Sequence, residues 1–202
     1  IGMILRTLDD LQLRENTIIV FMSDHVDLLV DNFLFYTGPY HYRHCAAVPF
    51  IVNWPGRVRS GKVVDGIVQE IDVMPTILDL AGCTTPAGVQ GRSQKEVLVT
   101  DSGDTGYTSA LIEYGVSGVS LPEAPAPNST PDLWTLRTVE WRLSYYPDLK
   151  TGELYRLEDD PDEFVNLWNH PDADRAQRAL KDELLDRVLQ AHDPLPLREK
   201  RY

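Results

Sequence analysis

The 202-residue sequence has little of three things that narrow a protein's function: cysteine, basic charge and long apolar runs. Its two cysteines, Cys45 and Cys83, are too few for a disulfide framework and do not fix the compartment. Nineteen basic residues stand against 31 acidic ones, and the formal net charge is -12. This balance disfavours nucleic acid as a partner, because phosphate binding needs clustered Lys and Arg. A small anionic substrate is not excluded, since a local cationic site or a metal can override net charge.

Apolar runs such as residues 48–52 are far too short to cross a bilayer, so we expect no membrane association. No basic start followed by an apolar run is present at the N-terminus, and no signal peptide is therefore visible. The localisation stays open between cytoplasm and periplasm. The chain begins with Ile1 rather than Met, which we interpret as a start after processing or inside a longer protein. The sequence predicts no particular oligomeric state.

The order of apolar patterns in the first half favours an α/β fold. Residues 3–13 have apolar side chains at helical spacing. Residues 17–22 form a continuous apolar, β-branched run, which is typical of a strand buried on both faces, as in a parallel sheet. A second buried strand is expected over 48–54. Asp72 is then a suitable N-cap for a helix that runs through Leu80.

The second half is predicted to be mainly antiparallel. Short strands are expected over 97–99 and 110–112, and a longer aromatic strand over 135–146 pairs back with 153–157 as a hairpin. A final amphipathic helix is expected over about 172–191. Gly, Ser, Pro and Ala dominate the segment between the halves. We therefore predict a first domain over 1–114, a linker over 115–133 and a small antiparallel β subdomain with a terminal helix over 134–202.

The sharpest chemical feature is Ser23-Asp24-His25, which follows the first predicted strand. Ligands gather at the carboxyl ends of strands in open α/β sheets. A carboxylate and a neutral imidazole there can both bind a divalent cation. On spacing alone, the simpler interpretation is that Asp24 caps a turn and His25 makes an ordinary hydrogen bond.

The surrounding motifs resemble the sulfatase family. Ser-Asp-His is followed by Val48-Pro49 and a hydrophobic strand, then by Trp-Pro-Gly at 54–56 and by Ile-Asp-Val-Met-Pro-Thr at 71–76. Residues 153–167 are similar to the family's C-terminal element, which contains Glu-Leu-Tyr, Asp-Pro-x-Glu and Asn-Leu. The order and spacing of these pieces together carry the resemblance, which covers nearly the whole chain.

The resemblance implies the C-terminal part of an alkaline-phosphatase-like α/β sandwich plus a small antiparallel β subdomain with a C-terminal helix. It also implies hydrolysis of a sulfate monoester, with Asp24 and His25 as two ligands of a divalent metal that polarises the ester. Calcium is the metal expected for sulfatases, with manganese as the alternative. Because calcium prefers oxygen ligands, His25 makes a transition metal worth testing.

The sequence also departs from the family pattern. It contains no Cys/Ser-x-Pro-x-Arg motif, which supplies the family's formylglycine nucleophile. Thr37 stands before Gly38 at the expected position of the sulfate-binding Lys, and Thr offers only one hydrogen-bond donor. Val26, Val30 and Phe33 occupy positions where the family has Gly, and positive φ at such positions would strain a valine.

Three hypotheses follow. The first is a fragment of a sulfatase that acts on sulfate monoesters, with the isolated chain inactive. The second is a phosphonate monoester or phosphodiester hydrolase of the same superfamily. The third is a degenerate, non-catalytic relative, for which Thr37 and the replaced glycines are the motivation.

Three further groups of residues have simpler interpretations. We interpret His41 and His44 as surface or hydrogen-bonded loop histidines. Asp159, Asp160, Asp162 and Glu163 lack the alternating spacing of a calcium loop, so we interpret them as a solvated turn before a helix. Tyr36, Tyr40 and Tyr42 are expected to anchor the loop by packing.

Overall fold

The structure is a computed structural model that describes residues 1–36, 38–115 and 132–191. The chain forms two compact units. Unit 1 contains Ile1–Asp24 and Val48–Tyr107, and unit 2 contains His25–Ala47 and the chain from Thr108 onward. These units divide the chain differently from the predicted ranges 1–114 and 134–202. Most of the predicted linker, and Thr37, lie outside the described residues.

Unit 1 is built from helices and one pair of strands. Its helical elements are α1 (Gly2–Asp10), η1 (Arg14–Asn16), η3 (Glu70–Asp72), α3 (Val73–Leu80) and α4 (Lys95–Val99). Strand β1 (Ile19–Met22) pairs with β4 (Phe50–Asn53), with Ile19 opposite Asn53 and Met22 opposite Phe50.

The pairing of β1 corrects the prediction of a parallel neighbour, because β4 runs antiparallel to it. The two strands are also less buried than predicted, with Phe21 40% and Ile51 58% exposed. A continuous apolar run indicates that a strand avoids water, but it carries no information about the direction of its partner. The prediction for 97–99 is wrong as well, since these residues form the end of helix α4.

Asp72 organises the C-terminal half of unit 1. Its fully buried carboxylate accepts hydrogen bonds from the backbone N–H groups of Gln69 (3.0 Å) and Arg92 (2.8 Å) and from the Tyr107 hydroxyl (2.6 Å). Asp72 is the N-cap residue of α3, as predicted, but its side chain closes the capping box of the preceding turn η3 instead. Gly82, with φ of +75°, follows the end of the helix.

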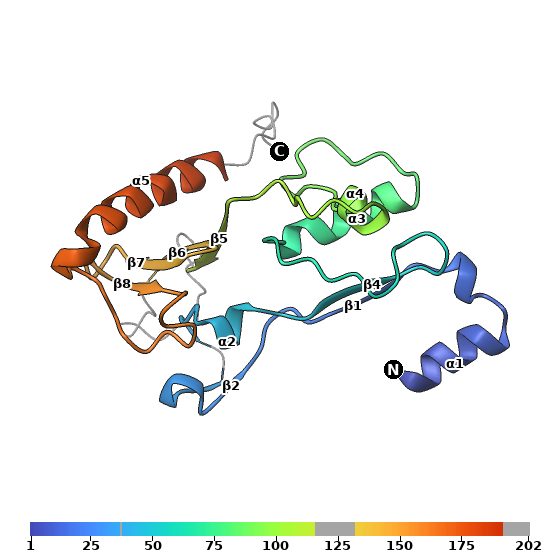
Figure 1. Ribbon diagram of the computed structural model, residues 1–202, viewed down its shortest axis with the longest axis horizontal. Coiled ribbons are helices and arrows are strands. Elements are labelled where there is room, and N and C mark those ends of the chain that lie inside the picture. Colours follow the sequence, from blue (N-terminus) through green and yellow to red (C-terminus); the bar gives the residue numbers. More distant parts are fainter. Residues whose placement is uncertain (37, 116–131, 192–202) are drawn as a thin grey trace, which may run out of the picture. The chain divides into compact units, whose positions relative to one another are not determined.

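Unit 2 is a four-stranded antiparallel sheet in the order β5-β6-β7-β8. The strands are β5 (Ser109–Tyr114), β6 (Leu133–Thr138), β7 (Trp141–Tyr146) and β8 (Thr151–Arg156). The short turn η4 (Pro171–Ala173) leads into helix α5 (Asp174–Gln190), which lies over one face of the sheet (Figure 1). Its Leu180 and Leu184 pack on Leu136, Leu143 and Leu154 to form the core.

Most of the predicted elements of unit 2 are confirmed, including a strand at 110–112, the hairpin that ends at 153–157, and the final helix. The single strand expected over 135–146 is wrong, because two strands, β6 and β7, occupy this range with a tight turn between them. That turn, Val139-Glu140, has neither Gly nor Asn, so the usual hairpin signal is missing.

Residues 25–47 complete unit 2. They contain β2 (Leu28–Leu29), η2 (Asp31–Phe33), β3 (Phe35–Tyr36) and α2 (Arg43–Ala46), and β2 pairs antiparallel with β3. We refer to residues 25–47 as the connecting segment, because it links β1 to β4 while making its contacts within unit 2. Across the described residues of both units, no helix combines the length and hydropathy that crossing a membrane requires.

Candidate functional site

Asp24 and His25 lie just beyond the end of β1, as predicted. Asp24 is exposed, and the Ser23 hydroxyl lies 3.5 Å from its Oδ1. The His25 side chain is 52% exposed, and its Nδ1 lies 3.9 Å from Oδ1 of Asp27. Within residues 1–36, 38–115 and 132–191, no three His, Cys, Asp or Glu side chains group in a way that could hold a metal ion. The role of Asp24 and His25 as metal ligands therefore stays a prediction.

The backbone of the connecting segment has an unusual conformation after β2. Val30 (φ 82°), Asn32 (φ 51°), Phe33 (φ 62°) and Tyr36 (φ 66°) are four of the eight non-glycine residues with positive φ in the described part of the chain. For a β-branched residue such as Val30 this is a genuine outlier. The expectation of strain at the replaced glycines is thus confirmed for Val30 and Phe33. It is wrong for Val26, whose φ is not positive.

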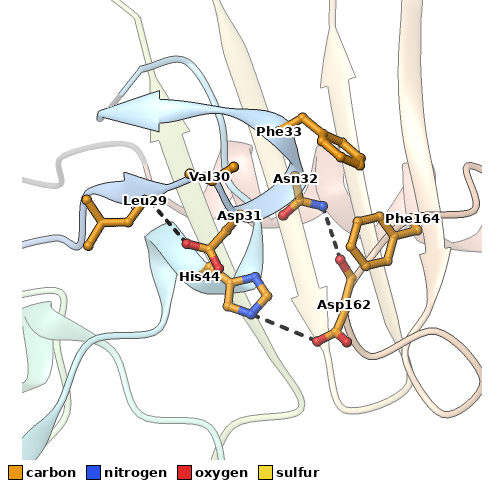
Figure 2. Close-up of a pocket in the computed structure, with 8 residues that line it drawn as sticks. All are labelled: Leu29, Val30, Asp31, Asn32, Phe33, His44, Asp162 and Phe164. Carbon is orange, nitrogen blue, oxygen red and sulfur yellow. Dashed lines mark hydrogen bonds and ion pairs between the residues drawn. The ribbon is translucent and has the colours of Figure 1, made fainter.

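These strained residues form one wall of a pocket of about 440 Å³. Residues 29–33 line it together with His44, Asp162 and Phe164 (Figure 2). The Asn32 Nδ2 donates hydrogen bonds to the backbone oxygens of Asp162 (3.1 Å) and Glu163 (3.4 Å). Nε2 of His44 lies 3.9 Å from Oδ1 of Asp162. Two segments about 130 residues apart in sequence are thereby held together around the pocket.

Behind the pocket lies a buried ion-pair cluster centred on Arg142, which is the largest fully buried side chain among the described residues. Its guanidinium lies 3.0 Å from the Glu153 carboxylate and 3.1 Å from that of Glu163, where the angle makes an ion pair but no hydrogen bond. It also lies over the rings of Tyr42 and Tyr155, 4.7 and 4.6 Å from their centres. One cation thus joins the connecting segment, through Tyr42, to the sheet.

Glu163 corrects the interpretation of 159–163 as a wholly solvated turn. Its side chain is 2% exposed, and its Oε2 accepts the backbone N–H of Arg43 at the start of α2 at 2.8 Å. Burial raises the pKa of Glu163, while Arg142 and the Arg43 N–H act in the opposite direction. The one sequence signal for this role is that Glu163 is the Glu of the Asp-Pro-x-Glu element.

His41 extends the cluster on the other side. It is buried, and its Nδ1 lies 2.8 Å from the Thr135 hydroxyl, which in turn lies 2.6 Å from the Ser144 hydroxyl. Ser144 Oγ accepts a hydrogen bond of 2.7 Å from Arg142. The interpretation of His41 as a hydrogen-bonded histidine is confirmed. Burial, with a smaller effect of the nearby Arg142 charge, lowers the pKa of His41 to about 4.

Comparison with known proteins assigns the chain to a family. Residues 32–190 match the family described as N-sulphoglucosamine sulphohydrolase, C-terminal. The chain belongs to the sulfatase family. This confirms the resemblance seen in the sequence, and with it the alkaline-phosphatase-like fold.

Three similar proteins illustrate the range of the family's relatives. An N-acetylglucosamine-6-O-sulfatase of Bacteroides thetaiotaomicron is 28% identical over 97% of this sulfatase chain and 34% of its own length. The structure of BT4656 in complex with its substrate D-glucosamine-2-N,6-O-disulfate is 27% identical, with a TM-score of 0.83 over 98% of this chain and 39% of that one. A phosphonate monoester hydrolase of Silicibacter pomeroyi has a TM-score of 0.84 over 96% of this chain and 38% of its own, but at 23% identity it shows the fold alone.

The sulfatase chain therefore spans about a third of the length of the relatives that it matches.

Replacing Glu163 by Gln should lower the free energy of unfolding of unit 2 by about 3 kcal/mol, because it removes one carboxylate from a buried cation. Urea unfolding followed by tryptophan fluorescence measures this loss, since three of the four tryptophans lie in unit 2. The matched control is Glu158→Gln, whose carboxylate pairs with Arg156 at 3.2 Å but is 74% exposed, and whose loss should be under about 0.5 kcal/mol. Equal losses in the two variants would contradict a structural role for the buried pair.

His41 should make unit 2 less stable in acid. An unfolded histidine titrates near 6.5, whereas the folded His41 binds its proton only near pH 4, so the unfolded state takes up the proton first as pH falls. Stability that is present above pH 6.5 is then lost down to about pH 4, amounting to about 3 kcal/mol. The difference in unfolding free energy between wild type and His41→Asn should shrink over this range. His170→Asn, at an exposed site, should leave the pH dependence unchanged.

Replacing Val30 by Gly should stabilise unit 2 by about 1 kcal/mol. Relief of the positive φ is worth about 1–3 kcal/mol, and the added freedom of glycine in the unfolded chain removes about 0.5–1 of this. Val26→Gly is the matched control in the same segment, and it should destabilise because Val26 has no positive φ to relieve. Thermal and urea unfolding of both variants give the comparison. A loss of stability in Val30→Gly would show that the conformation carries no strain.

Proposed function

We propose that the intact protein hydrolyses sulfate monoesters of hexosamine sugars, and that this chain supplies part of its metal site. The match of residues 32–190 to the N-sulphoglucosamine sulphohydrolase family carries the proposal. Two further relatives support the sugar class, since they are described as an N-acetylglucosamine-6-O-sulfatase and as a protein bound to a glucosamine disulfate.

The metal in this proposal is a divalent cation with Asp24 and His25 among its ligands. The donor chemistry fits in kind, because a carboxylate and an imidazole, both exposed, follow the end of β1. A complete site needs more ligands than this pair, and the rest would have to come from other parts of the intact protein. The bound cation would polarise the ester and lower the charge that the leaving sulfate develops. Calcium is proposed first, and the nitrogen ligand makes manganese the alternative.

The isolated 202-residue chain is not proposed to be active. Its sequence contains no Cys/Ser-x-Pro-x-Arg motif, and Thr37 replaces the expected sulfate-binding Lys. Sulfate release by the purified chain would contradict the proposed dependence on a nucleophile outside it. In the intact protein, Thr37→Lys should raise activity if the missing cation limits the rate.

Replacing His25 by Ala in the intact protein should lower kcat/KM for glucosamine 6-sulfate on the order of 100-fold, because one metal ligand is lost. The matched control is His170→Ala. Both imidazoles are about half exposed, and each has a carboxylate oxygen 3.9 Å from its Nδ1, but His170 lies at the start of η4. Sulfate release after chelation and re-addition of Ca²⁺ or Mn²⁺ identifies the metal.

Three outcomes would count against the proposal. Equal loss in the two histidine variants would remove His25 from the metal site. Turnover of a phosphonate monoester without turnover of the sulfate would favour the phosphonate hydrolase hypothesis. No turnover of either ester by the intact protein, with no metal bound in calorimetry, would favour a non-catalytic relative.

A further inference from the structure

We propose that the pocket lined by residues 29–33, His44, Asp162 and Phe164 is a binding subsite for an unsulfated hexosamine residue of the substrate. This inference rests on the proposed function, because it takes the substrate to be an amino sugar. It adds a second point of recognition that is chemically unlike a sulfate site.

The first observation is a pair of exposed aromatic rings. Phe33 and Phe164 are 86% and 61% exposed, although both belong to the pocket, and Figure 2 shows them at the same side of Asn32. Phenylalanine is among the residue types most often buried, so two exposed rings at one pocket indicate a surface that a ligand covers. The apolar face of a pyranose ring, which carries only C–H groups, matches such a surface.

The second observation is the sign of the charge. Asp31 and Asp162 place two carboxylates at the pocket, and neither Lys nor Arg is among its described lining residues. Carboxylates accept hydrogen bonds and attract cations, whereas they repel a sulfate group. The pocket therefore favours the hydroxyl and ammonium groups of a hexosamine and disfavours a sulfated position.

The third observation is that the pocket is held in shape before any ligand arrives. Asn32 ties the wall at 29–33 to the backbone at 162–163. Glu163 is fixed between Arg142 and the N–H of Arg43, so its neighbours Asp162 and Phe164 extend from an anchored residue. Asp31 accepts the backbone N–H of Leu29 at 3.1 Å. A site that needs no ordering on binding retains more of its contact energy as affinity.

The strained backbone contributes to the same arrangement. Val30, Asn32 and Phe33 all have positive φ, which turns the chain sharply at the wall of the pocket. Such strain persists only where the surrounding structure over-determines it, and it clusters at binding and catalytic sites. Here the hydrogen bonds of Asn32 provide that constraint.

Saturation-transfer NMR on the 202-residue chain tests the proposal, with D-glucosamine as the probe. An open site for one sugar ring should bind with a dissociation constant of about 1 mM or weaker, which this method detects. Transfer to glucosamine is expected with the wild-type chain, and it should be lost in Phe33→Ala/Phe164→Ala. The matched control is Phe35→Ala, because Phe35 is 61% exposed on the neighbouring strand β3 but does not line the pocket, and it should keep the signal.

Charge is tested with a second probe and a second variant. D-Glucosamine-2-N,6-O-disulfate should bind at least about 10-fold more weakly than glucosamine, and Asp162→Asn should narrow this difference. Thermal unfolding of each variant confirms that it is folded, which is expected because the substituted side chains are exposed.

The proposal is overturned if the wild-type chain gives no transfer, if the double variant binds as well as the wild type, or if the disulfate binds as tightly as glucosamine. These failures are distinct from a failure of the proposed function. They concern binding to this chain, whereas sulfate hydrolysis is measured on the intact protein.

Discussion

The contact between Arg142 and Glu163 is the constraint on which the rest of unit 2 depends. A guanidinium that is 1% exposed on its side chain has lost nearly all of its hydration, so its partners must supply what water no longer does. Glu153, Glu163 and Ser144 do so from two strands and one turn. Because Glu163 also receives the N–H of Arg43, the same carboxylate fixes the connecting segment against the sheet.

Polar contacts have this role because the connecting segment has little apolar burial of its own. Leu28 and Cys45 are its buried apolar side chains among the described residues, whereas Leu29, Val30, Phe33, Phe35 and Tyr36 are 55–76% exposed or more. Apolar packing alone would leave such a loop free to adopt several arrangements. Ion pairs and hydrogen bonds depend on direction and distance, so they select one arrangement, although an apolar cluster of similar size would be at least as stable.

Much of the fold could be predicted from local patterns. The core helix α5, the hairpin of β7 and β8, and the site of strain at Val30 and Phe33 all follow from periodicity or from the kind of residue that a position normally holds. Glu163 could not be found in this way, because four acidic residues in one turn look alike until Arg142, 21 positions earlier and buried, is placed beside one of them. The antiparallel pairing of β1 and the turn between β6 and β7 failed for a related reason, since both depend on partners or backbone angles that composition does not encode.

The separation along the chain between Arg43 and Glu163 has a consequence for biogenesis. During synthesis the connecting segment leaves the ribosome 120 residues before the carboxylate that secures it. Closing so long a loop is entropically costly and slow, and until then the apolar side chains of the segment face the solvent. Nascent chains in that state are prone to associate with one another, so an early encounter with a chaperone would protect this stretch more than any other part of unit 2.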